Sequence, residues 1–278
     1  MYINWVHHYL PKLSFFLALI ANPIFIYLVC TCKKSLFGSY RYLLSFFACF
    51  NLLAAVSDFM IPVCVFCYRY VFVTFVANGP FSMDSYYGEK VLYYRCGIVS
   101  GTYGILNVHF VFRYLTLKRN LFINKYFMPR GLILAILYVI FHIFIWSLVV
   151  GFCLHTSPEM RDYIRLPFQK LHNESIDNVT FVAGLFSETS PGIERRSWAG
   201  ILLLTVIASY SMVLYFVLGY KIIHGINVQL PTMSKQTGHM QKQLFKALTI
   251  QTIIPICVSF MPCSLSFYGA ALRIDFVK

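Results

Sequence analysis

Two cysteines separated by two residues, Cys64 and Cys67, have the spacing of a metal-binding or redox pair. A structural zinc site needs a second pair of ligands, and no second pair with this spacing accompanies them. The sequence also lacks HExxH, GxSxG and phosphate-loop motifs, and its long apolar segments contain only one acidic residue. We therefore expect neither an enzyme nor a metal or cofactor site.

That acidic residue, Asp58, lies in an apolar segment where a charged side chain costs about 2.5–3.5 kcal/mol at a helix centre. Such a residue usually faces a bundle interior, is paired or is protonated. Asn22, Asn51 and Asn107 lie in neighbouring segments and could join Asp58 in an intramembrane polar seam. Two interpretations stay open: contacts that hold helices together, and a ligand or ion site around Asp58.

The elements that must position these residues are membrane helices. The chain has 278 residues, of which 59% are hydrophobic and 12% charged, and this is too apolar for a soluble domain. About 20 helical residues cross a bilayer core, and the continuous apolar runs are too long for barrel strands. We predict one all-α transmembrane domain over residues 1–278, with six membrane helices at Leu13–Cys32, Tyr42–Phe66, Val91–Tyr114, Gly131–Leu154, Ser197–Tyr220 and Ala247–Leu272.

The charge distribution predicts how the helices are oriented. Three connecting segments are basic and lack acidic residues, which is typical of cytoplasmic loops; they contain Lys33, Lys34, Arg41, Lys118, Arg119, Lys125, Arg130, Lys221, Lys235, Lys242 and Lys246. The amino terminus is then extracellular, as is the large loop over residues 156–196. Both glycosylation sequons, at Asn173 and Asn178, fall in that loop. The net charge of +13 thus reflects orientation beside anionic lipid, and we expect no nucleic-acid partner.

Four prolines within the predicted helices remove backbone hydrogen bonds and predict kinks at Pro23, Pro62, Pro255 and Pro262. The segment before the sixth helix has apolar residues at helical spacing, which predicts a cytoplasmic extension of that helix. Cys96 and Cys153 lie at similar depth, so a disulfide between them is one option, and two free buried thiols are the alternative.

Several stretches resemble the nematode serpentine chemoreceptors, nearest to class J and related to the Str class. They are MYINWVHHYLPKLS at the start, NPIFIYLV (22–29), GSYRYLLSFFACFNL (38–52), HFVFRYL (109–115), SPEMRDYIR (157–165), RSWAGI (196–201) and MSKQTGHMQKQLFKALTIQTIIPICVSFMPC (233–263). The resemblance implies a rhodopsin-like G-protein-coupled receptor bundle. It also implies olfactory-type detection of small environmental chemicals in the plasma membrane of sensory neurons, including their cilia.

Carried over to this sequence, the resemblance places Arg113 and Tyr114 at the cytoplasmic end of the third helix, where such receptors engage a heterotrimeric G protein. Lys242 and Lys246 would line the inner end of the sixth helix, which moves outward on activation. Phe112 departs from the family, which generally has tyrosine before the arginine, and other receptor families have an acid there. Arg113 therefore lacks a neighbouring carboxylate, and any resting partner must come from elsewhere in the fold.

The family continues through a seventh helix, whereas this sequence ends at Lys278. The resemblance therefore predicts a truncated receptor with impaired folding and retention in the endoplasmic reticulum, unless an incomplete gene model accounts for the ending. Two other functions remain as alternatives. One is a six-helix transporter or channel subunit, and the other is a non-signalling receptor fragment that forms oligomers with full-length relatives. The sequence identifies neither the ligand nor the G protein.

Overall fold

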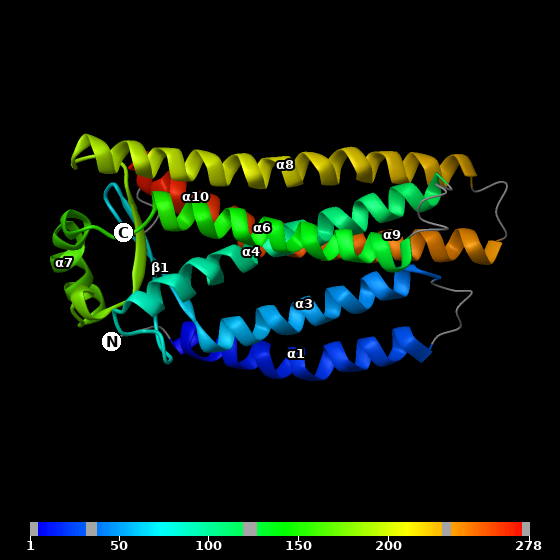
Figure 1. Ribbon diagram of the computed structural model, residues 1–278, viewed down its shortest axis with the longest axis horizontal. Coiled ribbons are helices and arrows are strands. Elements are labelled where there is room, and N and C mark those ends of the chain that lie inside the picture. The colour runs from blue at the N-terminus through cyan, green and yellow to red at the C-terminus, as the bar shows by residue number, and fades with distance from the viewer. Residues whose placement is uncertain (1–4, 32–37, 119–126, 230–234, 274–278) are drawn as a thin grey trace.

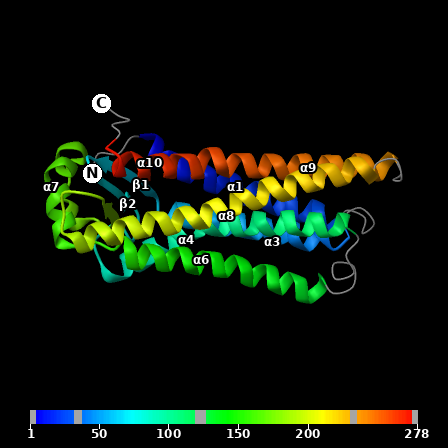
Figure 2. The same cartoon turned by 90° about the horizontal axis from the view of Figure 1, so that it is seen from above.

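The protein is a bundle of long helices with a small mixed cap at one end (Figure 1). The computed structural model describes residues 5–31, 38–118, 127–229 and 235–273. Lys33, Lys34, Arg119 and Lys125 of the predicted basic loops lie outside these residues. The amino end of α1 and the carboxyl end of α10 both lie at the capped end of the bundle (Figures 1 and 2).

The bundle helices are α1 (Trp5–Thr31), α3 (Tyr40–Met60), α4 (Tyr86–Leu117), α6 (Leu132–Cys153), α8 (Pro191–Gln229), α9 (Lys235–Pro255) and α10 (Met261–Ala271). Two π-helical turns join this set: η1 (Phe127–Gly131) precedes α6, and η4 (Ile256–Phe260) connects α9 to α10. Within the described residues, five helical segments are long and apolar enough to cross a membrane. This confirms a helical integral membrane protein, while the count of six crossing helices stays a prediction.

The third predicted membrane helix, α4, does not belong to those five segments because it contains more polar residues. It packs against α3, α6 and α8, so protein surrounds much of it (Figure 2). Its glycines allow close approach: a Cβ added at Gly97 would lie 2.6 Å from the carbonyl oxygen of Ile143 on α6. Small residues at a helix crossing permit this tight backbone packing in membranes.

The predicted second helix, Tyr42–Phe66, is wrong at its carboxyl end. The helix ends at Met60, and residues Val63–Tyr68 form strand β1 instead. Pro62 explains the break, because proline disfavours helical geometry at the residue before it and Ile61 has φ −133° and ψ 69°. Pro62 therefore terminates a helix and does not kink one.

An all-α fold was expected, but the cap contains a three-stranded antiparallel sheet. Its strands are β1 (Val63–Tyr68), β2 (Val71–Val76) and β3 (Phe181–Leu185), in the order β1-β2-β3. The predicted outer loop over residues 156–196 supplies β3, helix α7 (Pro158–His172), the 3-10 turn η2 (Ile176–Asn178) and the start of α8. Much of what was predicted to be loop is thus ordered structure.

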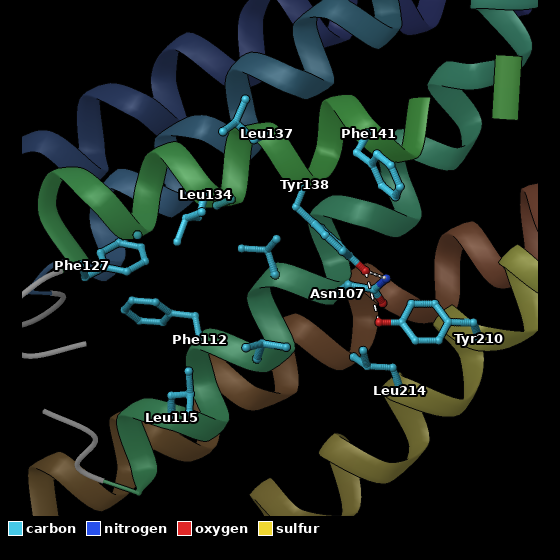
Figure 3. A pocket seen from close by; sticks show the side chains of 14 residues that line it. Asn107, Phe112, Leu115, Phe127, Leu134, Leu137, Tyr138, Phe141, Tyr210 and Leu214 are labelled. Carbon is cyan, nitrogen blue, oxygen red and sulfur yellow. Dashed lines mark hydrogen bonds between the residues drawn. The ribbon is translucent and has the colours of Figure 1, made fainter. Parts of the chain in front are cut away.

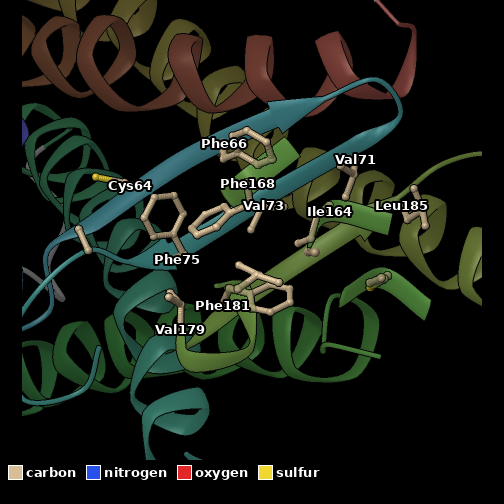
Figure 4. Packing of buried hydrophobic residues seen from close by; sticks show 14 residues of the cluster. Cys64, Phe66, Val71, Val73, Phe75, Ile164, Phe168, Val179, Phe181 and Leu185 are labelled. Atoms are coloured by element: carbon tan, nitrogen blue, oxygen red, sulfur yellow. The ribbon is translucent and has the colours of Figure 1, made fainter. Parts of the chain in front are cut away.

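Helix α7 covers the sheet with one apolar face (Figure 4). Met160, Ile164 and Phe168 are spaced by four residues and are fully buried against the strands. Ser157 caps the helix start by accepting a hydrogen bond from the Met160 amide, and Asn173 ends the helix in a left-handed conformation with φ 54°. The cap therefore has its own hydrophobic core.

The last predicted helix is longer and less regular than expected. Helix α9 begins at Lys235, which confirms a helical extension ahead of Ala247. Pro255 is the last residue of α9 and is followed by the π-helical turn, while Pro262 lies in the first turn of α10. Helical geometry thus changes near both prolines, as missing backbone donors require. Pro23 lies within α1, whose helix continues past it.

Candidate functional site

Arg113 lies near the carboxyl end of α4, at the end of the bundle opposite the cap. Only 7% of the residue is exposed. Its Nη1 donates a hydrogen bond of 3.1 Å to Oε1 of Gln241 on α9, and its guanidinium lies 4.1 Å from the ring centroid of Tyr40 on α3. The Nε and Nη2 groups have no hydrogen-bond partner among the described residues. A buried cation is thus held by one neutral acceptor and one aromatic face.

Tyr40 connects this arginine to a second buried polar group. Its hydroxyl is 2.9 Å from Nδ1 of His109, one α4 turn before Arg113. The Tyr40 ring also stacks on Phe112, with ring centroids 5.2 Å apart. Phe112 therefore packs beneath Tyr40, and the partner of Arg113 is Gln241 in the predicted helix extension.

The other predicted coupling residues surround this cluster without joining it. Lys242 and Lys246 are exposed on α9, next to the helix turn that contributes Gln241. Tyr114 is half-buried on α4, and Nζ of Lys221 on α8 lies 5.8 Å from the centroid of its ring. Three helices thus present basic or aromatic side chains at this end. A role for them in binding a G protein stays a prediction.

The predicted seam of Asn22, Asn51, Asp58 and Asn107 is not formed as one cluster. Asn22 donates to the Ala18 carbonyl of its own helix, and Asn51 is half-buried on α3. Asp58 forms an ion pair with Arg95 of α4. Pairing removes much of the cost of placing a carboxylate among apolar helices, which explains why Asp58 needs no amide neighbours.

Asn107 instead belongs to a polar network that the sequence reasoning missed. Its Nδ2 donates to the hydroxyls of Tyr138 on α6, at 3.0 Å, and Ser211 on α8, at 3.1 Å. His142 lies 3.1 Å from the Tyr138 hydroxyl and 3.2 Å from the Ser100 hydroxyl. Polar residues from three helices meet here, and only the depth that they share within separate apolar segments could have indicated it.

The cysteines form no pair that the sequence suggested. Cys64 and Cys67 are three residues apart on β1, so they point to opposite faces of the sheet, one buried and one exposed. Burial raises the pKa of the Cys64 thiol to about 11. Cys96 and Cys153 are both free thiols, which corresponds to the second of the two predicted options.

Both predicted glycosylation residues lie on the cap and are exposed. Asn173 follows the last turn of α7, and Asn178 ends η2, where its carbonyl accepts a hydrogen bond from the Asp84 amide. They are therefore at the opposite end of the bundle from Arg113. Their modification itself stays a prediction.

Comparison with known proteins identifies the family. The whole chain, residues 1–278, matches the family described as serpentine type 7TM GPCR chemoreceptor Srj. It is 33% identical to Serpentine receptor class J-38 of Caenorhabditis elegans, over 95% of this chain and 80% of that relative. It is 27% identical to the G-protein coupled receptor str-33 of the same species, over 91% of this chain and 75% of that receptor. The chain therefore belongs to the serpentine chemoreceptor family Srj, a family of G-protein-coupled membrane receptors and not of enzymes.

Proposed function

We propose that this protein detects small environmental chemicals and passes the signal to a heterotrimeric G protein at the end of the bundle that contains Arg113. The observation that carries the proposal is the hydrogen bond of 3.1 Å between Arg113 and Gln241, which joins α4 to α9. Family membership supports the receptor class. The arginine contact supports a specific position for coupling.

In this proposal the hydrogen bond holds the resting state. Movement of α9 away from α4 breaks it and leaves the guanidinium with all its donors available for a partner protein. A hydrogen bond to a charged group contributes about 1.5–3 kcal/mol, which corresponds to a population change of roughly 10- to 150-fold. That magnitude is large enough for a switch between two states. Tyr114, Lys242 and Lys246 would line the surface exposed by this movement.

We further propose that the cap is extracellular and that the protein acts in the plasma membrane, including that of sensory cilia. The two exposed sequon residues on the cap support this orientation, as do the basic residues Arg41, Lys118 and Lys242 at the other end. A small chemical would then reach the bundle from the capped side, and the G protein would approach Arg113 from the cytoplasm.

The test is G-protein activation in cells that express the protein with a panel of Gα subunits and are exposed to a library of volatile and water-soluble chemicals. We expect at least one chemical to produce a G-protein response that Arg113→Ala abolishes at unchanged surface expression. Lys118→Ala, an exposed change at the same helix end, is the matched control and should retain the response. Ion current or solute uptake without any G-protein response would overturn the proposal in favour of a transporter or channel.

A further inference from the structure

A cavity of about 650 Å³ lies between α4, α6 and α8, on the side of the bundle (Figure 3). Its walls are mostly apolar, with Phe112 and Phe127 at one end and Leu214 and Phe141 toward the other. Leu134 lines it and is 58% exposed, so the cavity opens sideways from the bundle. In a membrane protein, such an opening faces the lipid acyl chains.

The end of the cavity farthest from Phe127 is polar (Figure 3). Asn107, Tyr138 and Tyr210 meet there, and Asn107 is only 1% exposed. The Tyr138 hydroxyl donates to Tyr210, and the Ser211 hydroxyl donates to the Ile207 carbonyl, so both hydroxyls accept from the Asn107 amide nitrogen. This arrangement fixes the orientation of the Asn107 amide, so that its nitrogen and not its oxygen faces the two hydroxyls.

That oxygen, Oδ1 of Asn107, has no hydrogen-bond partner among the described residues. An unpartnered buried acceptor is costly, and native structures usually satisfy it. With His142 in the tautomer that donates from Nε2 to the Tyr138 hydroxyl, the Tyr210 hydroxyl accepts from Tyr138 at 3.5 Å, and no hydrogen bond in the described part of the chain uses the Tyr210 proton. The polar end therefore combines one unused acceptor with one unused donor. The Tyr138–Tyr210 bond is long and therefore weak, so little is lost if it opens to let a ligand reach the buried Oδ1.

We propose that this cavity binds a neutral, membrane-partitioning alcohol or phenol. Its hydroxyl would accept a hydrogen bond from Tyr210 and donate one to Asn107 Oδ1, and its apolar body would fill the space toward Phe127. A single hydroxyl satisfies both unused groups at once. A ketone or an ether can accept from Tyr210, but it has no proton for Oδ1.

The depth of the polar end disfavours a phospholipid headgroup at this position. Asn107 lies ten residues before Leu117, the end of α4, which places it roughly 15 Å along the helix from that end. That distance is about half of a hydrocarbon core of roughly 30 Å. A charged headgroup is strongly disfavoured at this depth, whereas a small molecule with one hydroxyl can enter from the acyl-chain region and orient freely.

The cavity also lies close to the cluster formed by Arg113, Tyr40 and Gln241. Phe112 lines the cavity and stacks on Tyr40, and the Arg113 guanidinium lies over the same Tyr40 ring. A molecule in the cavity therefore lies one packed aromatic ring away from that cluster. The binding inference itself goes beyond the proposed function, and its test requires no G protein.

The test is photolabelling of the full chain in lipid nanodiscs with a diazirine derivative of octan-1-ol, followed by peptide mapping. We expect labels on residues of α4, α6 and α8 around the cavity. Octan-1-ol should prevent this labelling, while octyl methyl ether, which cannot donate, should compete roughly tenfold less well. Equal competition by the two compounds, or labels spread over all lipid-facing helices, would overturn the proposal.

Three variants keep the test independent of folding defects. Leu134→Trp fills the cavity from its exposed wall and should abolish the protected labelling. Ile133→Trp is the matched control, because Ile133 is 52% exposed on the same helix but does not line the cavity. Tyr210→Phe removes the donor that both compounds use, so it should weaken competition by octan-1-ol and by the ether alike. Identical labelling of the two tryptophan variants would place the alcohol elsewhere.

Discussion

Arg113 and Gln241 are 128 residues apart in the sequence, and one hydrogen bond of 3.1 Å joins them across the uncapped end of the bundle. The acceptor is a neutral amide, so this contact between α4 and α9 is weaker than an ion pair would be. The strength of the link can therefore be adjusted in both directions by changing Gln241 alone.

Gln241→Glu replaces the amide oxygen by a carboxylate at the same position. If the contact holds the resting state, this variant lowers the G-protein nucleotide exchange that occurs without ligand. Gln241→Ala removes the acceptor and raises that exchange by roughly tenfold or more, since a hydrogen bond to a charged group contributes about 1.5–3 kcal/mol. The measurement is the exchange rate at matched receptor amounts. Gln243→Ala, an exposed change on the same helix, is the control, and equal effects of the two Gln241 variants would refute the link.

The close crossing of α4 and α6 makes a second prediction. Gly97→Ala places a methyl group 2.6 Å from the Ile143 carbonyl oxygen and against the Ser147 hydroxyl, so one helix must move. We expect a loss of about 1–3 kcal/mol in stability, measured as a lower thermal unfolding temperature in detergent. Gly192→Ala is the matched control because no atom lies within 4 Å of its added methyl group. An unchanged melting temperature for Gly97→Ala would show that this crossing is loosely packed.

The sequence allows the membrane helices to be predicted because long apolar runs have no other stable form in lipid. It does not separate α3 from β1, since Val63–Tyr68 continues the apolar run beyond Met60. Pro62 is the available signal, but a proline in an apolar run predicts a kink as readily as the end of a helix. Strands in the cap depend on pairing with distant segments, as β2 pairs with β3 at Phe75 and Phe181. Local pattern does not specify such a partner.

The candidate site, too, could be predicted only in part from the sequence. The family resemblance located Arg113, and the absence of a neighbouring acid pointed to a distant partner. Gln241 itself could not be identified, because many polar residues occur in the helix extension. Asp58 stands out as the acidic residue of an apolar segment, but its pairing with Arg95 depends on how α3 and α4 cross. Side-chain partners across helices follow from packing, which a single sequence does not encode locally.

The core of the cap makes a third prediction. Phe168 on α7 is fully buried against the sheet, so Phe168→Ala should cost about 3–5 kcal/mol and loosen the cap. Cys64 is buried in the same core and reports on opening. We expect a membrane-impermeant maleimide to modify Cys64 faster in this variant at fixed pH. Leu166→Ala, on the exposed side of α7 where Leu166 is 69% exposed, should leave the rate unchanged. Equal rates in the two variants would contradict the packing of α7 on the sheet.

Glu159 makes stability of the cap depend on pH. Its carboxylate accepts hydrogen bonds from the Thr189 hydroxyl and the Ser190 amide, and these bonds hold its pKa below the ordinary value of 4.5. The stabilising contribution is therefore complete above pH 4.5 and is lost as the pH falls through the lower pKa of the folded state. We expect the hydrogen-exchange protection factor of the Ser190 amide to fall as the pH is lowered below 4.5. Glu159→Gln should flatten this pH dependence. If Glu159→Gln keeps the same pH profile, the dependence belongs to another titratable group.

The orientation of the bundle makes the last prediction. Asn173 and Asn178 are exposed on the cap, so both can receive glycans if the cap enters the lumen of the endoplasmic reticulum. Glycosidase treatment should then increase the gel mobility of the expressed protein, and Asn173→Gln combined with Asn178→Gln should abolish that change. Each single variant should retain part of it. A sequon engineered into residues 234–238, before the exposed Lys242, should remain unmodified, because it would face the cytoplasm. Modification at that engineered site would reverse the proposed orientation and place Arg113 on the wrong side of the membrane for a G protein.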